Sequence, residues 1–77
     1  MLINVMQILL STDFKIGDVV YPKINDYYEE ESQLYYIVTG YDIMNTDESG
    51  MVTSYFIKVI GQVGDIVYFP PEAIEKK

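Results

Sequence analysis

The sequence has no cysteine, histidine, arginine or tryptophan among its 77 residues. Without cysteine and histidine the chain lacks the usual zinc ligands, and it can form neither a disulfide nor a Ser–His–Asp or Cys–His catalytic group. Its acidic residues do not follow the EF-hand spacing, and no phosphate-binding loop or dinucleotide-binding fingerprint is present. We therefore expect a non-catalytic protein with no metal and no cofactor.

Positive charge is also scarce. Five lysines stand against twelve aspartates and glutamates, so the formal net charge is −7. Affinity for nucleic acid comes mainly from cations on phosphates, and arginine is the commonest reader of guanine edges. The overall negative field also repels polyanions. We expect no direct nucleic-acid binding, whereas a basic protein partner fits the charge.

The composition is that of a folded globular protein, with 49% hydrophobic and 22% charged residues. A chain of this length predicts one domain, residues 1–77, with a small core whose stability depends on packing or on a partner chain. Residues with AT-rich codons far outnumber Gly, Ala, Arg and Pro, which favours a low-GC bacterium or one of its phages. No secretory signal or membrane span is recognisable, so we expect a cytoplasmic location, and the lack of cysteine fits such a reducing compartment.

The run from Met1 to Leu10 is apolar, and its pattern leaves strand and helix open. Asn4 and Gln7 would form a narrow polar stripe on a helix, whereas Ile3 and Val5 alternate as in a strand. The run lacks the basic start of a signal peptide and has about half the length of a membrane span. Exposing its side chains would cost about 1.5–3 kcal/mol each. We expect this N-terminal segment, residues 1–11, to complete the fold or to join two copies in a homodimer.

The rest of the chain carries four runs rich in β-branched and aromatic residues, separated by turn residues. The runs are residues 19–21, 34–43, 52–60 and 65–69. The second and third predict a hairpin across the turn NTDESG at residues 45–50. A proline at the first helical position predicts one short helical turn over residues 71–75.

A short motif occurs twice, as IGDVVY at residues 16–21 and as VGDIVY at residues 63–68. Glycine permits an unusual φ, and the aspartate side chain can bond nearby N–H groups. Each copy therefore predicts a tight turn that leads into a strand. A duplicated half-barrel or a paired ligand site is the alternative interpretation, although two copies are too few for a repeat array.

The opening FKIGDVVY, the long central hairpin and the closing GDIVYFPPEAIEKK resemble a small SH3-like barrel of the Tudor/KOW kind. The resemblance covers residues 14–77. It implies an all-β barrel of four to five antiparallel strands, with a helical turn after the fourth strand. This chain departs from the pattern because it stops soon after that turn, so we expect a fifth strand that is very short or absent. SH3 domains bind proline-rich peptides through a tryptophan, tyrosines and an acidic loop. This chain has no tryptophan, so such peptides are not the expected partner.

Two kinds of side chain are candidates for partner binding. Acidic residues gather in the loop 26–31 and in the hairpin turn, and eight tyrosines are too many for so small a core. Strand alternation predicts Tyr35 and Tyr41 on one face of the hairpin and Tyr36 on the other. Exposed tyrosine is typical of protein interfaces, although solvated acidic loops and tyrosines at a barrel rim are the alternative interpretation. The candidate partner-binding residues are Tyr27, Tyr28, Glu29, Glu30, Glu31, Tyr35, Asp47 and Glu48.

The sequence therefore favours a non-catalytic protein-interaction module that binds a protein partner through tyrosine and acidic loop residues. An acidic inhibitor that mimics nucleic acid and covers a cationic surface of a nucleic-acid enzyme, as phage counter-defence proteins do, is the alternative. A structural or oligomerisation protein is a third hypothesis.

Overall fold

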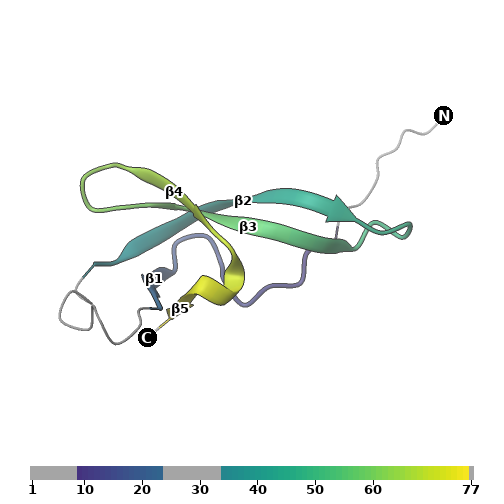
Figure 1. The fold of residues 1–77 in the computed structure, drawn as a ribbon, viewed down its shortest axis with the longest axis horizontal. Helices are drawn as coiled ribbons and strands as arrows, with labels where there is room; N and C mark the ends of the chain where they lie inside the picture. The colour runs from purple at the N-terminus through teal and green to yellow at the C-terminus, as the bar shows by residue number, and fades with distance from the viewer. Residues whose placement is uncertain (1–8, 24–33, 77) are drawn as a thin grey trace.

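The computed structural model describes residues 9–23 and 34–76, which form one antiparallel sheet of five strands (Figure 1). The strands follow the order β4-β3-β2-β1-β5 across the sheet. A short 3₁₀ helix, η2, precedes the last strand. The elements are β1 (Val19–Pro22), β2 (Tyr36–Thr46), β3 (Val52–Ile60), β4 (Ile66–Phe69), η2 (Pro71–Ala73) and β5 (Ile74–Lys76).

This arrangement confirms the predicted all-β fold, with five antiparallel strands and a short C-terminal helical turn. The strands β2 and β3 form the long central hairpin, with β4 on one side of it and β1 and β5 on the other. The two outermost strands, β4 and β5, do not pair with each other, so the sheet is open. No helix among the described residues is long or apolar enough to cross a membrane.

The first described residue lies at the edge of β3. Leu9 forms an isolated parallel β-bridge with Met51. Its N–H donates to the Gly50 carbonyl, and its own carbonyl accepts from the Val52 N–H, each at 2.9 Å. The remainder of the run for which a strand or a helix is predicted, residues 1–8, lies outside the described residues.

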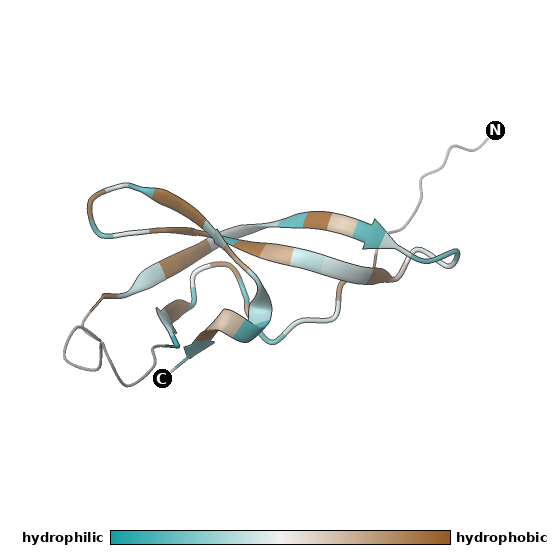
Figure 2. Ribbon diagram, in the orientation of Figure 1, coloured by the Kyte–Doolittle hydropathy of each residue, from teal (hydrophilic) through white to brown (hydrophobic). Residues whose placement is uncertain are grey.

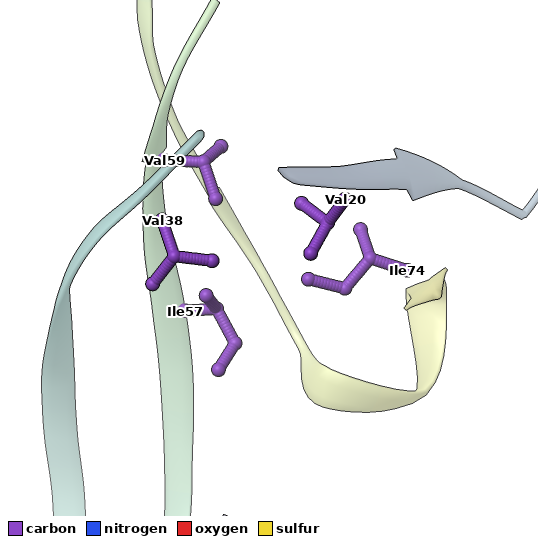
Figure 3. Packing of buried hydrophobic residues seen from close by; sticks show 5 residues of the cluster. All are labelled: Val20, Val38, Ile57, Val59 and Ile74. Atoms are coloured by element: carbon purple, nitrogen blue, oxygen red, sulfur yellow. The ribbon is translucent and has the colours of Figure 1, made fainter. Parts of the chain in front are cut away.

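Among the described residues, five aliphatic side chains form the buried core, and they come from both halves of the sheet (Figure 3). They are Val20, Val38, Ile57, Val59 and Ile74. Partly buried aromatic and aliphatic side chains pack around them. These are Phe14, Tyr36, Tyr41, Tyr55, Val67 and Phe69. The core therefore depends on β1 and β5 as well as on the central hairpin.

The C-terminal helical turn is shorter than the predicted span 71–75. The helix η2 ends at Ala73, and Ile74 already begins β5. The Ile74 side chain is buried in the core, and its residue pairs with Pro22 of β1. A single helical turn has little stability of its own, so core burial and strand pairing determine the conformation here.

Tyr36 and Tyr41 lie on the same face of the sheet, so the predicted alternation is wrong. Both pack against the core. The register of β2 against β3 shifts between Val38 and Gly40, where β2 has one extra residue. Such a bulge moves every later side chain of the strand to the other face. The Tyr41 hydroxyl also donates to the Phe14 carbonyl, which ties the segment before β1 to β2.

The two copies of the repeated motif form different turns, each with a glycine at positive φ. The φ angles are 98° at Gly17 and 87° at Gly64. In the first turn the Asp18 N–H donates to the Lys15 carbonyl at 2.9 Å. In the second, the Gly64 N–H donates to the Gly61 carbonyl at 3.1 Å and closes the hairpin between β3 and β4. The prediction of a tight turn before each strand is confirmed.

Candidate protein-interaction surface

Four aliphatic side chains line up across four neighbouring strands. The register pairs Val19 of β1 with Ile37 of β2. Ile37 is paired in turn with Ile60 of β3, and Ile60 with Ile66 of β4. Cross-strand partners lie on the same face, with Cβ atoms about 4.5–5.5 Å apart. These four residues form a continuous line across the strands, which we call the outer row.

The outer row points away from the core. Val19 directly precedes the buried Val20, and Ile37 directly precedes the buried Val38, while successive side chains of a strand point to opposite faces. The exposed fractions are 42% for Val19, 37% for Ile37 and 51% for Ile66. Single exposed aliphatic residues are ordinary, but a contiguous exposed apolar patch marks an interaction site.

Tyrosines extend this apolar surface on both sides of the outer row. On β4, Tyr68 is 48% exposed. On the other side Tyr35 is 41% exposed, and its ring centroid lies 6.4 Å from that of Tyr21. We define the outer face as the outer row together with Tyr21, Tyr35 and Tyr68. Figure 2 shows the hydrophobic positions along β4 and along the part of β3 with which it pairs.

Charged side chains border the outer face without entering the outer row. Lys58 pairs with Tyr68, and Glu75 pairs with Tyr21. Asp65 lies in the turn that leads into β4. The surface thus has an apolar centre, phenol hydroxyls beside it, and a rim with charges of both signs. An apolar centre with tyrosines and a polar rim is the usual composition of a protein interface.

Of the predicted site residues that the structure describes, only Tyr35 lies on the outer face. Asp47 and Glu48 lie in the turn between β2 and β3, at the other end of the 11-residue β2. Strand geometry puts them roughly 35 Å from Tyr35. The structure therefore does not bring the tyrosine and the turn acids together. The other predicted site residues, Tyr27, Tyr28, Glu29, Glu30 and Glu31, lie outside the described residues.

Asp47 has a local role in its turn. Its carboxylate accepts hydrogen bonds from the Ser49 hydroxyl at 2.7 Å, the Ser49 N–H at 2.9 Å and the Met51 N–H at 3.0 Å. These bonds, above all the one from the hydroxyl, hold the pKa of Asp47 below its usual value. The turn ends at Gly50, whose φ is 91°. Asp47 therefore stabilises the hairpin turn from within.

Asp18 fixes the start of β1 in a similar way. Its carboxylate accepts the Lys15 N–H at 2.8 Å, and the Lys76 ammonium lies 3.6 Å from it. The hydrogen bond from Lys15, followed by the charge of Lys76, lowers the pKa of Asp18. Lys76 also donates to the Asp13 carbonyl at 2.7 Å, so β5 is tied to the segment before β1.

Acidification is expected to destabilise the protein through Asp18 and Asp47. Both carboxyls have a folded pKa below the usual value, so they stabilise the fold above the unfolded pKa and lose this effect as pH falls through the folded pKa. Asp47→Asn keeps an acceptor oxygen but not the charge, so its melting temperature should fall less between about pH 5 and pH 3. Thermal unfolding followed by circular dichroism checks this. Glu48→Gln, in the same turn, is the control, and equal pH dependence in all three proteins contradicts this role.

A depression open to solvent lies between residues 11–14 and residues 71–76, and it includes no residue of the outer row. Its lining mixes lysine and acidic side chains, Lys76 and Glu75 among them. Within residues 9–23 and 34–76, no three or more potential metal-ligating side chains are gathered at one place. No protein-family model, curated protein or solved structure matches the chain.

The sequence identified Tyr35 but missed the outer row. Each strand contributes one member, so no periodicity along the chain reveals it. Only one pair of the row has a local signal, because the length of the turn GQVG places Ile66 opposite Ile60. A register continued from the turn NTDESG would have paired Ile60 with Val38. The bulge between Val38 and Gly40 shifts β2 by one residue and brings Ile37 opposite Ile60 instead.

Proposed function

We propose that the protein is a non-catalytic protein-interaction module and that the outer face is its docking surface. The observation that supports this is the outer row, an aliphatic line across four strands whose members on β1, β2 and β4 are exposed. Burying an aliphatic side chain is worth about 1.5–3 kcal/mol, so a partner that covers the row gains substantial free energy. The tyrosines of the outer face are the residue type that most often carries interface energy.

The negative charge of the chain favours a partner whose binding surface has basic residues around an apolar centre. The net charge is −7, and several acids lie in the sequence between Tyr21 and Tyr35, two members of the outer face. Rim charges mainly accelerate association and select partners of opposite sign. Residue usage and the lack of cysteine support an encounter in the cytoplasm of a low-GC bacterium or of a phage host. Tyr27, Tyr28, Glu29, Glu30 and Glu31, which lie between these two tyrosines in the sequence, stay candidate partner-binding residues, as do Asp47 and Glu48.

The same net charge supports a second candidate function, that of an acidic inhibitor covering a cationic surface on a nucleic-acid enzyme. The two functions differ in the force that drives binding. An inhibitor of this kind should lose affinity steeply as salt rises and should compete with DNA or RNA. Docking through the outer face depends on apolar burial and should respond much less to salt.

A pair of lysine substitutions tests docking through the outer face. Ile66→Lys introduces a charge in the outer row, and Val63→Lys introduces the same charge at a side chain that is 90% exposed in the preceding turn. Wild type and both variants are immobilised, exposed to the lysate of a low-GC bacterium and compared by quantitative mass spectrometry. We expect a partner whose capture falls roughly tenfold or more with Ile66→Lys and is unchanged with Val63→Lys.

Circular dichroism of the three proteins shows whether both variants are folded. A partner that all three capture equally contradicts docking through the outer face. Capture that disappears at high salt in wild type and is competed by DNA supports the inhibitor instead.

A further inference from the structure

The outer face has an apolar counterpart in the sequence of the same chain. Residues 1–8 (MLINVMQI) contain six hydrophobic side chains and no charged one. Leaving such side chains in water costs about 1.5–3 kcal/mol each. The core of the described residues has five members, which come from β1, β2, β3 and β5. The N-terminal residues and the outer row therefore both gain by being covered with apolar surface.

The length of the chain prevents residues 1–8 from covering the outer row of their own molecule. Leu9 is held at the start of β3, where its carbonyl accepts the Val52 N–H at 2.9 Å. The outer row crosses β3 at Ile60, about 27 Å further along the strand. Eight residues reach at most about 29 Å when fully extended, so little more than the first residue of the segment could reach Ile60. A second molecule can donate its N-terminal residues without this restriction.

We propose that two copies of this chain exchange their N-terminal segments, each placing residues 1–8 on the outer face of the other. This inference rests on the proposed function, because it names the partner of the same surface. The two contacts are identical and related by a twofold axis, so the assembly closes as a dimer. The outer row receives the apolar side chains, and the tyrosines of the outer face border them.

Charge favours contact through residues 1–8 over direct contact between two sheets. Each chain carries a net charge of −7, so two copies repel, and salt screens this repulsion over about 8 Å at physiological ionic strength. An uncharged segment joins the two molecules without bringing their acidic residues together. Dimerisation should therefore strengthen as salt rises, whereas docking of a basic partner should weaken slightly.

Sedimentation velocity of the full chain, at several protein and salt concentrations, tests the dimer. We expect wild type to dimerise, and both deletion of residues 2–8 and Ile66→Lys to raise the dissociation constant at least about tenfold. Val63→Lys adds the same charge outside the outer row and should dimerise as wild type does. Circular dichroism establishes that each variant is folded before the comparison is made.

The absence of cysteine permits a direct test of the exchange itself. A Leu2→Cys variant that carries a nitroxide label is mixed with unlabelled wild type enriched in nitrogen-15. The nitroxide broadens the amide signals of residues near it, and only the wild-type copies give these signals. Any broadening therefore comes from a neighbouring molecule. We expect the amide signals of Ile37 and Ile66 to broaden.

Three results would overturn the exchange: a monomeric wild type, a dimer that survives the deletion, or broadening confined to other residues. A monomer whose lysate partner is still lost with Ile66→Lys overturns this inference alone and leaves the proposed function in place.

Discussion

Replacing Ile57 by alanine is expected to cost about 2–5 kcal/mol of unfolding free energy. The Ile57 side chain is completely buried in the middle of the core, where it packs among side chains from β1, β2 and β5. Small single domains are marginally stable, with about 5–15 kcal/mol in total, so this loss would remove a large share of the stability of the fold. Urea unfolding followed by circular dichroism measures it.

Ile66→Ala is the matched control for this experiment. It removes the same atoms from a side chain that is half exposed in the outer row, so we expect it to cost less than about 1 kcal/mol. Equal losses in the two variants would mean that the inner and outer faces of the sheet are wrongly assigned. Ile66→Ala should also weaken docking, which Ile57→Ala affects only through unfolding.

Truncating the chain after Ala73 is expected to abolish cooperative folding. The truncation removes β5, including the buried Ile74, and leaves the four-residue β1 as an edge strand with one neighbour. Loss of the Ile74 side chain alone is worth about 2–5 kcal/mol, and the pairing of β5 with β1 is lost as well. Amide signal dispersion in an NMR spectrum and urea unfolding both report the result.

Ile74→Val provides a graded comparison with the truncation. It removes a single methylene from the same site and should cost about 0.5–1.5 kcal/mol while leaving a cooperative transition. A truncated chain that unfolds at the wild-type midpoint would show that β5 contributes nothing to the fold. It would also mean that the fold ends with the helical turn, as expected if the fifth strand is absent.

Local composition was sufficient to locate most strands but not to predict their ends. The density of β-branched and aromatic residues predicted strands over residues 34–43 and 52–60, which correspond to β2 and β3. The strand β2 extends to Thr46 because β3 pairs with it there. The strand β5 has only the residues Ile, Glu and Lys, which carry no clear strand signal, and it forms by pairing with β1. Such pairing depends on contacts between residues that are far apart in the sequence.

The direction of side chains was harder to predict than the strands themselves. A single bulge between Val38 and Gly40 places Tyr36 and Tyr41 on one face, and nothing in the local sequence requires it. The tyrosine count correctly suggested that some rings are exposed, and Tyr35 and Tyr68 are. The acidic candidates depended on charge alone. Charge does not distinguish a docking residue from one such as Asp47, which bonds its own turn.

The outer row runs across the strands, so no continuous stretch of the chain encodes it. A peptide copied from any one strand carries one of its four side chains, and the proposed docking surface exists only while β1 to β4 are paired. Binding and folding are therefore thermodynamically linked. A ligand present at about 100 times its dissociation constant adds about 2.7 kcal/mol to the stability of the fold. For so small a domain, occupancy of the outer face would be a major determinant of how much of the protein is folded at all.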